Sequence, residues 1–129
     1  MECSCVLVDI DEFVNLLNDR YIKSARKDHE CSECNNGIKK GESYHSHSYV
    51  FHKEFTEHKF CEDCWSLKEE FLCEGYNYGM IRGDIRNHIM DSSGEISSEC
   101  ILNLNDGARD FVLSEIQDVF DDLNLDDDD

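Results

Sequence analysis

The chain has 129 residues, of which 40% are hydrophobic and 33% are charged, as in a typical globular domain with one modest core. Its net charge of −18 comes from 30 acidic and 12 basic residues, and it argues against broad docking on DNA, RNA or an anionic membrane. No apolar run approaches the ~20 residues of a membrane span, and the first residues lack the basic start and apolar stretch of a secretion signal. We therefore expect a cytoplasmic protein, in which cysteine pairs more often hold metal than form disulfides.

The first predicted elements are a helix and a hairpin. The apolar residues Phe13, Val14, Leu17 and Tyr21 have helical spacing, and Asp11 is a candidate N-cap. Aromatic and polar residues alternate over 43–51, and residues 55–60 follow after a short break. This alternation is typical of a half-buried strand and predicts a β-hairpin.

The rest of the chain is predicted to be helical. Residues 62–73 indicate one helix, isoleucines at 81, 85 and 89 indicate a second, and a short third helix can begin at Ser97. The last helix, 107–125, has the clearest amphipathic pattern, with Asn105 as its cap. Its apolar stripe consists of Val112, Ile116, Val119, Phe120 and Leu123.

The strongest motif is a matched pair of cysteine knuckles. Cys31 and Cys34 are separated by two residues, and so are Cys61 and Cys64. Two such turns supply the four thiolates that structural zinc prefers, and the hairpin between them can bring the pairs together. A knuckle, a hairpin and a helix that carries the last ligands make a treble-clef arrangement. We therefore expect one structural Zn²⁺ at these four residues.

The other cysteines and the histidines leave alternatives open. Four cysteines remain outside the two knuckles: Cys3, Cys5, Cys73 and Cys100. They could hold a second metal ion, or they could be small buried side chains. Four histidines gather in the hairpin: His45, His47, His52 and His58. They could bind metal or titrate near neutral pH, or they could be polar hairpin residues without a special role.

Several segments resemble a group of small zinc-binding proteins from phages and prophages. The similar segments are residues 25–34, 38–44, 59–64, 71–73, 78–81 and 108–110, together with the N-terminal Cys-x-Cys. The resemblance covers most of the chain and implies a phage origin and a treble-clef zinc core, but it carries no activity. The chain departs from the group at the hairpin tip, 50–54, where relatives often have glycines and a tryptophan, and in its heavier acidic tail.

The expected fold is a small α+β domain over residues 1–125. A zinc core occupies about 25–74, a helical part occupies about 76–125, and residues 126–129 form a disordered acidic tail. Helices flank the zinc core on its N- and C-terminal sides. The oligomeric state cannot be read from these features.

The residues do not indicate an enzyme. Zinc held by four cysteines has no open position for water, and the 62–73 helix lacks the ligands of an HNH-type nuclease. The sequence also lacks a glycine-rich phosphate loop and a nucleophile elbow.

The charge suggests a function by binding. Residues 90–129 hold 13 acids and one base, a net charge of −12. Such a surface could occupy the basic nucleic-acid-binding surface of a host protein and inhibit it, as small acidic anti-CRISPR proteins and DNA mimics do. The candidate partner-binding residues are Asp110, Asp118, Asp121 and Asp122.

Two other interpretations of the charge remain. The acidity could serve solubility alone. The chain could also be a zinc-stabilised adaptor or a nucleic-acid-binding module that uses its basic 20–40 segment and the aromatic residues near the hairpin, Tyr44, Tyr49, Phe51 and Trp65. Direct nucleic-acid binding is the less favoured of these because the field of the whole chain opposes it.

Overall fold

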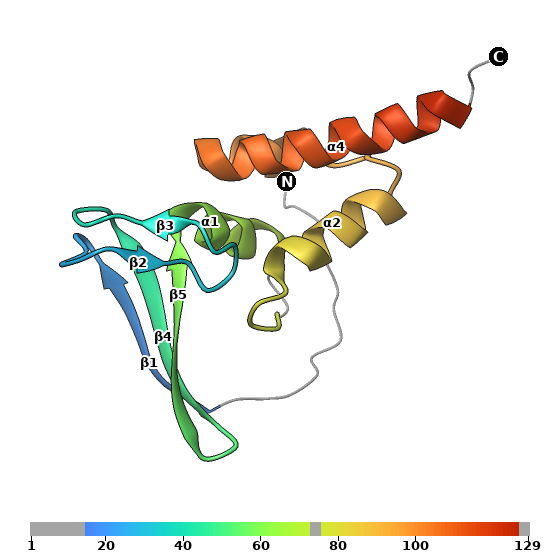
Figure 1. The fold of residues 1–129 in the computed structure, drawn as a ribbon. Coiled ribbons are helices and arrows are strands. Elements are labelled where there is room, and N and C mark those ends of the chain that lie inside the picture. Colours follow the sequence, from blue (N-terminus) through green and yellow to red (C-terminus); the bar gives the residue numbers. More distant parts are fainter. Residues whose placement is uncertain (1–14, 73–75, 127–129) are drawn as a thin grey trace.

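The computed structural model describes residues 15–72 and 76–126. They form a mixed α+β structure with two small sheets and four helices (Figure 1). The strands are β1 (Asn15–Ile22), β2 (His29–Glu30), β3 (Gly37–Ile38), β4 (Tyr44–Phe51) and β5 (Glu54–Cys61). The helices are α1 (Glu62–Phe71), α2 (Ile81–Asp91), α3 (Ser98–Leu102) and α4 (Asp106–Asp126).

The predicted hairpin is confirmed. Strands β4 and β5 pair antiparallel, with Phe51 opposite Glu54 and Tyr44 opposite Cys61. The two connecting residues, His52 and Lys53, have φ angles of 52° and 66°. Two consecutive positive φ angles are typical of the tight turn that matches the twist of a hairpin. The register brings Cys61 to the end of the sheet where α1 begins.

The prediction of an N-terminal helix is wrong for residues 15–22. They form strand β1, which pairs antiparallel with β4 in a sheet of order β1-β4-β5. Leu17 and Tyr21 are 58% and 52% exposed, so the apparent helical stripe has no core to face. Strand β1 pairs with the edge of β4, whose backbone N–H and C=O groups would have no partner if residues 15–22 were a helix. This pairing outweighs the helical spacing of the apolar residues. Asp11, Phe13 and Val14 lie outside the described residues.

The predicted helices from residue 62 onward are confirmed. Helix α2 buries Ile81, Ile85 and Ile89 completely, and α3 starts after Ser97. The side-chain oxygen of Asn105 accepts a hydrogen bond from Ala108 N at 2.9 Å, which is the predicted cap of α4. These helices share one core with the end of the sheet, and its largest fully buried members are Phe60, Leu67, Phe71, Ile81, Ile85, Ile89 and Val112.

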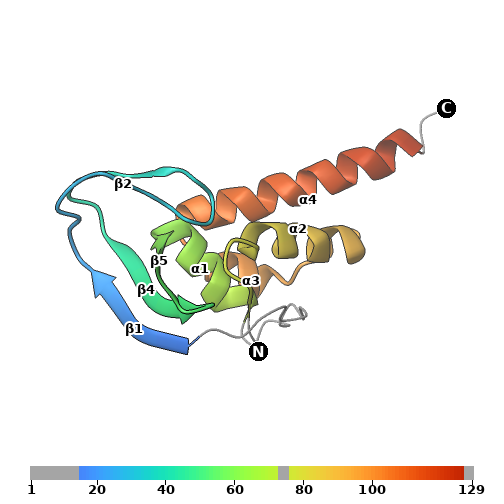
Figure 2. The ribbon, with the colours of Figure 1, turned by 60° about the horizontal axis from the view of Figure 1, so that its bottom comes forward.

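Helix α4 packs on α1, α2 and α3 along most of its length, and its C-terminal end extends past them (Figures 1 and 2). Of its predicted stripe, Val112 is fully buried and Ile116 and Val119 are partly buried. Phe120 is 43% exposed, and its ring lies against Gly94, where an added Cβ would come within 2.8 Å. None of the helices in the described residues is long and apolar enough to cross a membrane.

A second, smaller core surrounds the cysteine knuckles. It consists of Ala25, Cys31, Ile38, Tyr44 and Cys64, which are all buried. The short β2-β3 ribbon lies beside the end of β5 and the start of α1 (Figure 1). The two cores meet along α1, since Cys64 belongs to the smaller one and Leu67 to the larger one.

Candidate metal centre

The two cysteine pairs come from two kinds of local structure. Cys31 and Cys34 lie on the turn between β2 and β3, which Cys31 N closes by donating to Asn36 O at 2.9 Å. Asn35 takes a left-handed conformation there, with φ of 65°, and asparagine tolerates this conformation better than most residues. Cys61 is the last residue of β5 and the N-cap of α1, and Cys64 lies in the first turn of that helix.

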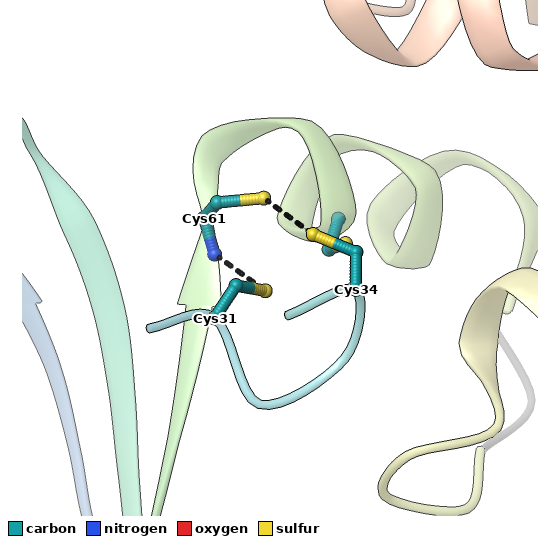
Figure 3. A group of neighbouring side chains, drawn as sticks. Cys31, Cys34 and Cys61 are labelled. Atoms are coloured by element: carbon teal, nitrogen blue, oxygen red, sulfur yellow. Dashed lines mark hydrogen bonds between the residues drawn. The ribbon is translucent and has the colours of Figure 1, made fainter. Parts of the chain in front are cut away.

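The four sulfur atoms converge as the spacing predicts. All four lie within 4.8 Å of one another, and Cys34 Sγ is 3.8 Å from Cys61 Sγ. A tetrahedral zinc site with bonds of about 2.3 Å would place its sulfurs about 3.8 Å apart. Figure 3 shows the sulfurs of Cys34 and Cys61 pointing toward each other, with Cys31 beside them. The geometry therefore fits a four-thiolate metal ion.

The thiols cannot all ionise on their own. Hydrogen bonding to Cys31 raises the pKa of the Cys61 thiol to about 12, and it also raises the pKa of Cys64, with contributions from Cys61 and from burial. The pKa of Cys31 is lowered, because both of those thiols donate to its sulfur. The protein alone therefore favours the thiolate at Cys31 and disfavours it at Cys61 and Cys64. A divalent ion would allow the whole set to ionise and would close the cluster.

Donors from two other places approach the sulfurs. The backbone N–H of Cys61 donates to Cys31 Sγ at 3.3 Å, and the Nε of Arg82 in α2 donates to Cys64 Sγ at 3.2 Å. Four thiolates and one Zn²⁺ carry a formal charge of −2. The guanidinium offsets part of that charge and ties α2 to the centre.

A buried glutamate, which the sequence did not predict, also connects the first knuckle to β5 and to the start of α2. The side chain of Glu33, inside the first knuckle, is fully buried, and its Oε2 lies 2.7 Å from His58 Nε2. Its carboxylate also accepts hydrogen bonds from the backbone N–H groups of Gly79 and of Ile81, the latter at 3.0 Å. Glu33 therefore caps the start of α2, which has no cap of its own. Only its place between two ligand cysteines could have suggested this role.

Three of the four hairpin histidines, His45, His47 and His58, belong to an aromatic layer with Trp65 and Tyr78, whereas His52 is exposed at the hairpin tip. His45 stacks on Trp65 with ring centroids 4.0 Å apart, and its Nε2 lies 3.0 Å from Glu62 Oε1. His47 is buried, with Nδ1 2.9 Å from the Tyr78 hydroxyl and Nε2 3.4 Å from Asp19 Oδ1. Within residues 15–72 and 76–126, the four cysteines are the only group of three or more His, Cys, Asp or Glu placed to hold a metal.

Most of the other candidate cysteines lie outside the described residues, namely Cys3, Cys5 and Cys73. Cys100 is buried and disulfide-bonded, and a sulfur in that state is not a thiolate ligand. A second metal site that includes Cys100 therefore does not fit this structure. The four aspartates of α4 that the sequence indicated for partner binding are all exposed: Asp110, Asp118, Asp121 and Asp122.

We predict that the purified protein contains one tightly bound Zn²⁺ at the four cysteines and that a strong chelator unfolds it, because metal binding and folding are coupled at such sites. A second equivalent would indicate a further site that does not use Cys100 as a thiolate. Cys34→Ala should lower the zinc content and destabilise the fold as the chelator does. The measurements are elemental analysis and circular dichroism, with the exposed Asn36→Ala as a control in the same turn. A well-folded, metal-free wild type would contradict the prediction.

We predict that Glu33→Ala lowers the free energy of unfolding by about 3 kcal/mol, because it leaves His58 and two backbone donors without their acceptor. Urea denaturation of the zinc-loaded protein measures this. Glu54→Ala, at the exposed hairpin tip, is the matched control and should change it by less than ~0.5 kcal/mol. Equal losses of unfolding free energy in the two variants would show that the contacts of Glu33 do not stabilise the fold.

We predict that stability falls as the pH is lowered through the ordinary histidine range, in part because of His47. Burial lowers the pKa of its imidazole, and the nearby Asp19 opposes this only partly. Below about pH 6.5 this histidine therefore binds a proton in the unfolded chain but not in the native one, which lowers the free energy of unfolding. Between pH 7.5 and 5.5, urea denaturation should show a smaller loss of unfolding free energy for His47→Gln than for wild type. His52→Gln, at the exposed tip, should lose as much as wild type. Equal losses for all three proteins would show that His47 is not a source of the pH dependence.

Comparisons of the chain with protein-family models, with curated proteins and with solved structures found no match. The resemblance to phage zinc proteins therefore stays a hypothesis. Function has to be inferred from the side chains described above.

Proposed function

We propose that this chain is a non-enzymatic zinc protein with a treble-clef core that presents an acidic helix to a basic partner. The partner is a host protein of nucleic-acid metabolism or defence in the cytoplasm, and the chain inhibits it by occupying the surface that binds nucleic acid. The observation that supports this most directly is the uncompensated acidic face of α4.

No base neutralises that face in the part of the chain that the structure describes. Asp110, Asp118, Asp121 and Asp122 form no ion pair among the described residues; Asp121 accepts only a hydrogen bond, from Gln117 at 3.0 Å. Arg109, the only base after residue 89, is turned toward backbone. Its guanidinium donates to the carbonyl groups of Ile101, Leu102 and Leu104 and lies 3.4 Å from the carboxylate of Asp106, which is not one of these four residues.

The helix also holds the carboxylates in a fixed arrangement. Asp118, Asp121 and Asp122 are neighbours at i, i+3 and i+4, and Asp110 lies on the same side of the helix by its period. Two half-exposed apolar side chains, Leu113 and Phe120, border this face. A folded helix presents charge at lower entropic cost than a flexible tail. Carboxylates in such a row can pair with the arginines of a nucleic-acid groove.

The metal centre supports a structural role. Four thiolates fill the coordination of zinc and leave no position for a substrate or an activated water. The sulfurs of Cys31 and Cys64 are also buried in the small core. A zinc ion here would stabilise the fold and would carry no chemistry.

The aromatic residues near the hairpin offer little to a nucleic acid. Tyr44 and Tyr49 are buried, and Trp65 is covered by the stacked ring of His45. These rings are covered by their neighbours and do not form a platform for bases. The binding-module alternative therefore rests on the basic segment and on Phe51, which is partly exposed at the end of β4.

We predict that neutralising the acidic face abolishes partner capture. Immobilised wild type should capture a nucleic-acid-binding protein from bacterial lysate at 0.15 M salt, and DNA should compete for that protein. The variant Asp110→Asn, Asp118→Asn, Asp121→Asn, Asp122→Asn should capture at least tenfold less, mainly through slower association.

The matched control removes four exposed carboxylates elsewhere: Glu30→Gln, Glu54→Gln, Glu69→Gln and Asp91→Asn. It should retain most of the capture. Equal losses in the two variants would show a general charge effect, and a captured protein for which DNA does not compete would contradict nucleic-acid mimicry.

We predict that the zinc-loaded protein does not cleave DNA or RNA, with or without added Mg²⁺ or Mn²⁺. A closed zinc site cannot activate water. Incubation with plasmid and single-stranded RNA, followed by electrophoresis, tests this. Metal-dependent nicking that persists through repurification and disappears in His45→Ala would establish an enzyme instead.

A further inference from the structure

A hollow lined by basic residues lies apart from the acidic face of α4. It has a volume of about 800 Å³, which is within the usual range for small-molecule sites. It lies where the end of β1 and the start of β4 meet the loop that leads to β2. Its lining includes no carboxylate and consists of Arg20, Ile22, Lys23, Ser24, Arg26, Lys27, His29 and Tyr44.

The nearby acids do not neutralise these bases. Asp28 accepts a hydrogen bond from the backbone N–H of Lys40 at 2.8 Å, and Glu42 accepts one from that of Lys39 at 2.7 Å. Glu57 lies 3.6 Å from Arg20, so that guanidinium is partly paired. Within the described residues, Lys23, Arg26 and Lys27 form no ion pair. Residues 20–29 hold four bases and one acid, a local charge of +3 in a chain of −18.

The loop that carries these bases is anchored. Ala25, in its middle, is buried, and its backbone N–H donates to Glu42 O at 2.8 Å while its carbonyl accepts from Gly41 N at 2.9 Å. His29 and Tyr44 are in contact at the base of the hollow, with ring centroids 5.3 Å apart. Tyr44 belongs to the small core that also contains Cys31 and Cys64. The cations are therefore presented on a fixed backbone, which lowers the entropic cost of binding an anion.

We propose that this hollow binds a compact polyphosphate group, such as the triphosphate of a nucleotide. Guanidinium and ammonium groups pair with phosphate oxygens through charge-assisted hydrogen bonds, and Arg26 can do so in a bidentate manner. The rest of the chain selects for a small ligand. A short anion meets mainly these bases and the Glu57 carboxylate beside Arg20, because charges farther than about 8 Å are largely screened at physiological salt. A long nucleic acid would also run past acidic surface.

The test is a titration of the full zinc-loaded chain, labelled with ¹⁵N, with inorganic triphosphate in 0.15 M salt. Amide shifts should concentrate at residues 20–29 and fit one site. Arg26→Gln with Lys27→Gln should weaken binding at least tenfold, since each charge-assisted hydrogen bond is worth about that much. Lys39→Gln with Lys53→Gln, the same charge change at exposed sites outside the hollow, should weaken it less than about twofold.

Two further arms identify the source of the phosphate. A nucleoside triphosphate should bind at least as tightly as inorganic triphosphate, and a single-stranded DNA oligomer of about 12 nucleotides should bind more weakly than either. Shifts spread over the surface, or equal losses in the two double variants, would overturn the site. An oligomer that binds more tightly than triphosphate would overturn the compact ligand and make the hollow a nucleic-acid contact.

Discussion

The convergence of four cysteine sulfurs is the constraint on which the rest of the structure depends. It joins the turn between β2 and β3 to the end of β5 and the start of α1, segments that are about 30 residues apart in the chain. Two polar contacts then fix α2 to the same place, through Arg82 at Cys64 and through Glu33 at Ile81. A small chain with two modest cores gains from such a crosslink, because neither core alone buries much surface.

The same connections explain how a zinc centre can serve an acidic helix. Helix α1 carries Cys64 in one core and Leu67 in the other, and α4 packs on that second core through Val112. The orientation of the acidic face therefore depends on elements that the cysteine cluster brings together, and a bound metal ion would hold them there. The two charged regions occupy different ends of the molecule, with bases on the loop before β2 and acids on α4. Their separation lets the chain carry opposite surfaces that do not neutralise each other.

Much of this could be predicted from local patterns, but the buried polar contacts could not. The two matched Cys-x-x-Cys pairs predicted the cluster, because one metal ion needs all four thiolates. Isoleucines one turn apart predicted α2, because that pattern reflects a single helix. Strand β1 was predicted as a helix, since the open edge of β4 that it covers lies more than 20 residues away. Arg82 carries no signal in the sequence, because a base in a helix is normally exposed, and the only hint at Glu33 is its place between two ligand cysteines. Only the folded chain brings each to its partner.

X-ray absorption at the zinc edge tests the central claim most directly, because it reports the atoms bound to the metal in the intact protein. If four cysteines fill the site, the spectrum should show four sulfur atoms at about 2.3 Å from the zinc and no bound nitrogen or oxygen. The expected ligands are Cys31, Cys34, Cys61 and Cys64. A nitrogen or oxygen atom in the first shell would contradict the account. It would mean an incomplete thiolate set, an open coordination position and a centre that is not purely structural.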